Sequence, residues 1–196
     1  NLAPPTVTSF NYGIEELYKM ASDNEEMKMA EAKVKREKIG VTLAKYKYFP
    51  EFEIGVQYKD IVKTSKDELM VSLGVKVPLW FSKNSALNKE AKFNLQKSIQ
   101  EKNALSNDIK NRVKNIYFKI TNSYRLTKLY ESSLIPQSKK SMEIAETWYK
   151  QGQGSFSGVL ETQSIWFNFQ LAYYRALTDY LKNISDMEMV TGEALY

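Results

Sequence analysis

The amino-acid sequence predicts a mainly α-helical fold that is interrupted once by a β-hairpin. Over most of the chain, apolar residues recur every three or four positions, which is typical of long helices in an antiparallel coiled coil. Two stretches differ: EFEIGVQYKD (51–60) and LMVSLGVKVPLW (69–80) alternate apolar and polar residues with the period of two expected of strands. Three glycines then gather in QGQGSFSG (151–158), where the helical pattern breaks and a turn is expected.

Composition excludes several kinds of chemistry. The 196 residues are 43% hydrophobic and 26% charged, which is enough to bury a core in one or two domains. The sequence has no Cys and no His, so it offers no disulfide, thiol nucleophile, imidazole acid–base group or His-based metal site. No run of about 18 apolar residues predicts a transmembrane helix. The opening NLAPPTVTSF lacks a basic region followed by an apolar stretch, so we expect any signal peptide to be already removed.

The charge is basic but dispersed. A net charge of +5 could indicate nucleic acid or anionic lipid as a partner. Lys and Glu alternate along most of the chain, however, and no like-charge run stands out. This pattern favours an ordinary solvated surface.

Local signals place the first helix and its end. Residues 1–12 contain Pro4 and Pro5 and read as an extended lead-in, and a short helical turn is expected at 14–20. Ser22 and Glu25 fit a capping box that would open a helix over 23–46. Pro50 closes that segment because the residue before a proline avoids the helical conformation.

Each predicted strand has an apolar face and a polar face. The polar stretch DIVKTSKDE (60–68) would turn the hairpin. Strands of about ten residues cross a bilayer when tilted in a closed barrel, with apolar side chains toward lipid and polar ones toward the lumen. The candidate lumen residues are Glu51, Glu53, Gln57, Lys59, Ser72 and Lys76.

Aromatic residues mark one end of the hairpin. Antiparallel pairing brings the start of the first strand beside the end of the second. A cluster of aromatic residues at this end has the composition of an interfacial girdle in a membrane protein. The girdle candidates are Tyr46, Tyr48, Phe49, Trp80 and Phe81. Periodicity alone leaves a second interpretation open, in which the hairpin packs on the helices of a soluble α+β domain and these aromatics belong to its core.

The second half of the chain predicts two long helices. Ser82 would cap the first, which continues through Pro136 with a kink to residue 150 and measures about 100 Å at 1.5 Å per residue. The second begins after the glycine turn and ends at Gly192. Trp148, Trp166 and Tyr173 occupy seam positions and are interpreted as packing residues.

The order of these elements resembles one family. Residues 14–58, the stretch VSLGVKVPLWFSKNSALNKEA (71–91) and residues 134–192 are similar to the TolC-like outer membrane efflux proteins, in which a helix enters a barrel at a YFP-type junction and a strand ends in a PL-aromatic turn. The resemblance covers nearly the whole chain. It covers one structural repeat and looks like the second half, or a fragment of a longer protein, whereas family members carry two repeats and four strands per subunit.

The resemblance implies a function without catalysis. Family members are trimers whose twelve-stranded barrel and periplasmic helical tunnel form the exit duct of tripartite efflux pumps or type I secretion systems. They meet a periplasmic adaptor and an inner membrane pump at the helical tip, and transport through them is passive. By this resemblance the chain is not an enzyme, needs no cofactor or metal, does not bind nucleic acid, and lies in the bacterial outer membrane with its helices in the periplasm. A half-length chain would need six copies to supply twelve strands, or would form no barrel and be held by its helices instead.

The resemblance also divides the chain and assigns its sites. Residues 1–49 would be the lead-in and ascending helix, 50–81 the membrane hairpin, 82–150 the descending periplasmic helix, 151–158 the periplasmic tip turn and 159–191 the last helix. Adaptor docking falls on Gly152, Gln153, Gly154, Ser155, Phe156 and Ser157. Gly158 and Glu161 match the carboxylate positions of the pore constriction, so one acid is missing here.

Two other classes of function remain as alternatives. A soluble or membrane-surface coiled-coil scaffold would bind partner proteins along its helices and touch anionic lipid with basic residues. An enzyme is the weaker alternative, because acids such as Asp108, Glu143 and Glu161 are scattered and pair with no base or phosphate-binding loop.

Overall fold

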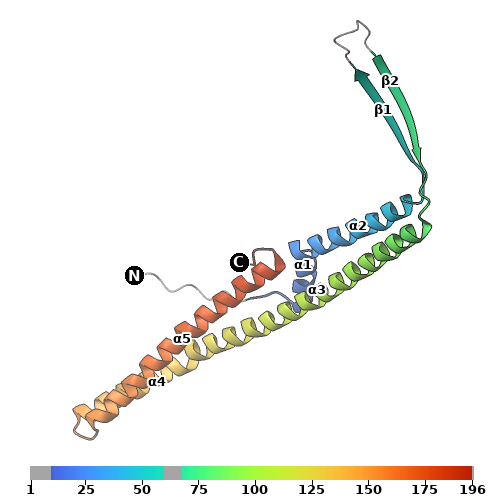
Figure 1. Cartoon of the computed structure of the whole chain (residues 1–196). Helices are drawn as coiled ribbons and strands as arrows, with labels where there is room; N and C mark the ends of the chain where they lie inside the picture. The colour runs from blue at the N-terminus through green and yellow to red at the C-terminus, as the bar shows by residue number, and fades with distance from the viewer. Residues whose placement is uncertain (1–9, 60–67, 196) are drawn as a thin grey trace. The chain divides into compact units, whose positions relative to one another are not determined.

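The computed structural model describes residues 10–59 and 68–195 (Figure 1). The predicted fold class is confirmed: the chain is mainly helical and contains one antiparallel β-hairpin. The chain divides into two compact units, a hairpin unit of residues 26–105 and a helical unit of residues 1–25 with 106–196. The elements are α1 (Ile14–Ser22), α2 (Glu25–Tyr46), β1 (Glu51–Lys59), β2 (Glu68–Lys76), α3 (Phe81–Leu129), a π-helix (Tyr130–Leu134), α4 (Ile135–Lys150) and α5 (Phe156–Thr191).

In the hairpin unit, helix gives way to strand at a proline. After α2 ends, the backbone N–H groups of residues 47–49 still donate to carbonyls three or four residues earlier, and these bonds stop at Phe49. Pro50 then forces the extended conformation on its neighbour. β1 and β2 pair in one register, from Glu51 opposite Lys76 to Lys59 opposite Glu68. The expected meeting of the first strand's start with the second strand's end is therefore confirmed.

The second strand is shorter than the sequence pattern predicted. It ends at Lys76, so Val77 and Leu79 lie outside the ladder although they continue the alternation. Pro78 lacks a backbone N–H, and β1 begins only at Glu51, which leaves the residues after Lys76 without a partner. The predicted turn at 60–68 and the first nine residues of the predicted lead-in lie outside the described residues, apart from Glu68, which begins β2.

Two predicted helix starts are wrong. Ser22 ends α1, and its hydroxyl donates to the Lys19 carbonyl at 2.7 Å, so it does not open α2 in a capping box. α3 begins at Phe81, one residue before the expected cap Ser82, because the Asn84 N–H already donates to the Trp80 carbonyl.

Below the hairpin, charged side chains join α2 to α3. Lys33 contacts Glu101 at 2.6 Å and Lys102 contacts Glu31 at 2.7 Å. Among the described residues of this unit, only Met27, Asn84 and Ser98 are buried. The hairpin unit thus contains almost no apolar core of its own.

The helical unit contains the core. Val113 and Ile120 of α3 and Tyr180 and Met187 of α5 are almost fully buried, and the Tyr124 and Tyr180 rings lie 5.4 Å apart. α1 joins this core through Leu17. The predicted end of the last helix is confirmed by Gly192, whose φ of +74° and N–H bond to the Glu188 carbonyl form a left-handed cap.

The predicted kink at Pro136 takes the form of a π-helical segment. Proline cannot donate to the carbonyl four residues earlier, and its ring would collide with that carbonyl. The helix widens over Tyr130–Leu134 and then resumes as α4 at Ile135, the residue before Pro136. α4 and α5 run side by side in opposite directions and are joined by a short turn (Figure 1).

Candidate functional site

The hairpin presents a continuous apolar face to solvent. Register places Phe52 opposite Val75, Ile54 opposite Leu73, and Val56 opposite Val71. Phe52 is 79% exposed and Leu73 is 81% exposed, and none of the apolar side chains on the described strands is buried. The alternative in which the chain's own helices cover this face does not describe the structure.

The opposite face of the hairpin is polar, and at its centre little space is left between Gly55 and Ser72. Lys76 pairs with Glu53 at 3.2 Å across the strands, and both side chains are well exposed. A Cβ on Gly55 would lie only 2.6 Å from the Ser72 hydroxyl, so a larger residue at Gly55 would displace Ser72. All candidate lumen residues whose side chains are described, Glu51, Glu53, Gln57, Ser72 and Lys76, lie on this face; the Lys59 side chain lies outside the described residues.

A buried asparagine connects the two ends of the hairpin. Asn84, in the first turn of α3, donates from Nδ2 to the Lys47 carbonyl at 2.9 Å, and the residue is 7% exposed. This bond joins the segment that enters β1 to the helix that follows β2. Sequence reasoning missed Asn84, because nothing local distinguishes it from the other asparagines of the helix.

The girdle candidates all lie at this junction with their rings exposed. Trp80 is 76% exposed, and the Tyr46 and Phe49 rings lie 6.0 Å apart. Tyr48 and Phe81 are exposed as well. The aromatic residues therefore form a band at the helix end of the hairpin, outside any core.

The tip turn between α4 and α5 is held by backbone bonds and one cap. Gly152 has φ +75°, a conformation that favours glycine. The Gln153 and Gly154 N–H groups both donate to the Trp148 carbonyl, at 2.9 and 3.2 Å. A Cβ on Gly154 would approach the Trp148 and Tyr149 backbone to about 3.2 Å, which is closer than ordinary contact.

The predicted turn boundaries at the tip need correction. The turn covers residues 151–155, whereas Phe156, Ser157 and Gly158 already belong to the first turn of α5. Ser155 is the N-cap, and its hydroxyl accepts a bond from the Gly158 N–H at 3.1 Å. Sequence reasoning included Ser155 in the turn but missed this role, although a serine before a helical run is a recognisable signal.

The constriction candidates lie on α5 just beyond the tip. Gly158 is half-buried in the first turn, and its carbonyl accepts the Thr162 hydroxyl at 3.0 Å. Glu161 is exposed. The two residues lie within one turn of the same helix, and Glu161 is the carboxylate of this pair.

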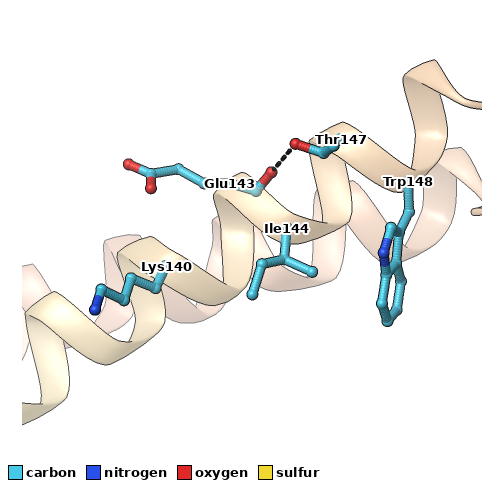
Figure 2. A pocket seen from close by; sticks show the side chains of 5 residues that line it. All are labelled: Lys140, Glu143, Ile144, Thr147 and Trp148. Atoms are coloured by element: carbon cyan, nitrogen blue, oxygen red, sulfur yellow. Dashed lines mark hydrogen bonds between the residues drawn. The ribbon is translucent and has the colours of Figure 1, made fainter.

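An open apolar groove lies on α4 next to the tip. Ile144 and Trp148 project on the same side of the helix, one turn apart, and are 51% and 56% exposed (Figure 2). The groove holds about 340 Å³ and is completed by Lys140, Glu143 and Thr147, whose hydroxyl donates to the Glu143 carbonyl at 2.8 Å. Trp148 was interpreted as a packing residue, yet much of its ring is accessible.

The other two seam aromatics are more enclosed. Trp166 and Tyr173 are half-buried in α5. Burial, the nearby Glu131 carboxylate and Tyr174 raise the pKa of the Tyr173 phenol above its ordinary value. The phenol therefore stays protonated and neutral through the physiological range.

Nothing in the described part of the chain forms a metal site of the usual kind. No group of three or more His, Cys, Asp or Glu side chains comes together there. Asp108 pairs with Arg112 on its own helix at 3.0 Å, and Glu143 and Glu161 stay exposed on two different helices. None of the described helices is both long and apolar enough to cross a membrane.

These features define a class of protein: long paired helices that end in a capped tip and carry an exposed amphipathic β-hairpin. Solved structures of this class match closely in shape. A membrane protein from Pseudomonas aeruginosa has a TM-score of 0.84 at 12% identity, and the match covers 99% of this chain and 45% of that one. VceC, an outer membrane protein from Vibrio cholerae, has a TM-score of 0.76 at 14% identity, covering 97% and 47%.

A third structure and the sequence family complete the comparison. The CmeC outer membrane channel of Campylobacter jejuni has a TM-score of 0.73 at 14% identity, covering 91% of this chain and 40% of that one. No curated protein is similar in sequence at a significant level. The family model "Outer membrane efflux protein" matches residues 17–193, so the chain belongs to this family of outer membrane efflux channels. It spans less than half the length of the solved structures that it matches.

Proposed function

We propose that the chain is one repeat of a passive outer membrane exit duct that serves a tripartite efflux pump or a type I secretion system. In this proposal β1 and β2 contribute to an oligomeric β-barrel, and the helices extend into the periplasm. The duct opens a path but drives no transport, so it uses no catalytic residue and no cofactor.

The observation that supports this proposal most strongly is the exposed apolar face of the hairpin. Soluble proteins rarely expose a large contiguous apolar patch without a partner. Here the patch lies on strands of nine residues each, about the length that crosses a bilayer when tilted. A partner-binding scaffold has no need for an apolar face of this length backed by a polar face.

The tip supports a docking role for the adaptor protein. Residues 151–157 are all exposed, and the exposed Trp148 and Tyr149 lie directly before them. Exposed aromatics beside a rigid turn are typical of contact surfaces. We propose that Gly152, Gln153, Gly154, Ser155, Phe156 and Ser157 form this surface together with the groove on α4.

Conductance across a planar bilayer tests the duct. The intact protein should give long-lived channels, and a ring of Glu161 carboxylates near the tip should make them prefer cations. Glu161→Gln should reduce the cation preference without changing the number of channels, whereas Glu15→Gln, an exposed acid on α1, should leave it unchanged. A protein that fractionates as soluble and leaves bilayers silent would contradict the proposal.

A further inference from the structure

The foot of the hairpin is basic. The segments 38–50 and 77–89 flank the two strands and contain no Asp or Glu. They carry five lysines, which we call the basic collar: Lys38, Lys45, Lys47, Lys83 and Lys89. A second acid-free segment, 109–129 on α3, carries six Lys and Arg residues, but two of them, Arg112 and Lys128, pair with the carboxylates Asp108 and Glu131.

Tertiary structure brings the two halves of the collar together. The Asn84 bond to the Lys47 carbonyl joins the two segments at their hairpin ends. Three collar lysines lie within two residues of an aromatic girdle residue: Lys45, Lys47 and Lys83. The other two, Lys38 and Lys89, lie about 12 Å from the nearest girdle residue of their own helix, at 1.5 Å per residue. The collar therefore follows the aromatic band on the side away from the strands.

The collar lysines are available for an external anion. All five are exposed, and Lys38, Lys45, Lys83 and Lys89 form no ion pair within the described residues. Lys47 contacts Glu51 at 3.5 Å, with both side chains well exposed. Such a surface pair contributes little, so Lys47 can exchange its partner readily.

We infer that the collar binds the phosphates of anionic phospholipids in the leaflet that borders the helix end of the hairpin. This inference rests on the proposed function, since that function places the strands in a bilayer. Exposed Trp, Tyr and Phe rings position the junction at headgroup depth, and lysines just beyond them reach phosphate groups with their flexible stems. The attraction fades within about one Debye length, so it acts only where the girdle already holds the junction at the surface.

Binding to vesicles tests the inference on the 196-residue chain. We compare vesicles of phosphatidylcholine with vesicles that contain 30% phosphatidylglycerol. Trp80 is made the only tryptophan by W148F and W166F, and brominated acyl chains then quench it when the girdle enters the bilayer. We expect quenching in both lipids, with affinity at least tenfold higher for the anionic vesicles at low salt.

Charge-neutral variants isolate the collar. The variant K45Q/K83Q/K89Q should lose most of the preference for anionic vesicles. Each lysine that is removed should lower the affinity for these vesicles about fivefold. The matched control K110Q/K114Q/K139Q removes the same charge from exposed helix positions of the helical unit and should keep the preference. Added salt should weaken the wild-type preference more than that of the collar variant, which keeps only Lys38 and Lys47.

The outcomes separate this inference from the proposed function. Equal quenching of Trp80 in both lipids, or equal losses in the two triple variants, would overturn the collar and leave the membrane hairpin standing. Absence of quenching in every vesicle would overturn the membrane hairpin, and the collar with it.

Discussion

The two units of the molecule are stabilised in different ways. The helical unit buries Leu17, Val113, Ile120, Tyr180 and Met187 in a core shared by three helices. The hairpin unit buries only three of its described residues, and its helices are joined by exposed ion pairs such as Lys33 with Glu101. Its apolar side chains point outward instead. The comparison indicates that the helical unit has an apolar core of its own, although it also exposes large apolar residues such as Phe118 and Phe167, whereas the hairpin unit has almost none.

The largest effect should come from a charged residue on the apolar face of the hairpin. Val56→Lys should prevent insertion of the hairpin, because a lysine facing lipid near mid-bilayer costs about 2–4 kcal/mol per copy. Gln57→Lys, one residue along on the polar face, should insert normally. Flotation with vesicles and channel counts in planar bilayers measure both. Similar losses in the two variants would remove the distinction between the faces.

The second effect concerns the bond that joins the two ends of the hairpin. Asn84→Ala should lower the free energy of unfolding by about 1–3 kcal/mol, because the hydrogen bond of Asn84 joins the two ends of the hairpin. Its loss would leave the part-buried Lys47 carbonyl without a partner. Thr127→Val is the matched change in the helical unit. Its hydroxyl donates to the Ser123 carbonyl of its own helix at 2.8 Å, so the loss should stay below about 1 kcal/mol. Urea denaturation compares them, and a larger loss for Thr127→Val would reverse the ranking.

The third effect is local to the tip of the helical unit. Gly152→Val should destabilise the turn by about 1–2 kcal/mol, since a β-branched residue is strained at φ +75°. Gly158→Ala should be neutral or stabilising by about 0.5–1 kcal/mol, because the residue is helical and the new Cβ would meet Ser155 at an ordinary 3.5 Å. Thermal melts followed by circular dichroism check both, and equal melting temperatures would argue against a strained turn at Gly152.

The smallest effect is electrostatic and belongs to the hairpin unit. The hydrogen bond from Lys33, with its charge and that of Lys97, lowers the pKa of the Glu101 carboxyl despite an opposing contribution from burial. A lowered folded-state pKa means that the pair stabilises the fold at neutral pH and stops doing so as the pH falls through that pKa. Lys33→Gln should therefore raise the pKa of Glu101 toward its ordinary value, which NMR titration can follow. Lys139→Gln, in the helical unit, should leave it unchanged.

Several parts of this description could be predicted from the sequence because their signals are local. The period of two in residues 51–59 defines both faces of β1 without reference to any other part of the chain. Gly152 and Gly192 take positive φ at helix ends, as glycines in such positions commonly do. Ser22 shows the limit of such signals: the same serine and glutamate spacing occurs at the end of α1, where the hydroxyl bonds backward.

The sequence by itself determined that long helices would precede and follow a two-faced hairpin along the chain, since periodicity decides which side chains share a face. Only the tertiary structure decided that the apolar face stays uncovered and that Asn84 reaches the Lys47 carbonyl. It also turned two lysine segments, dispersed along the chain, into one basic collar. The physical reason is that residues on opposite sides of a hairpin meet only when the strands pair, and no local pattern records which side chains lie across from one another.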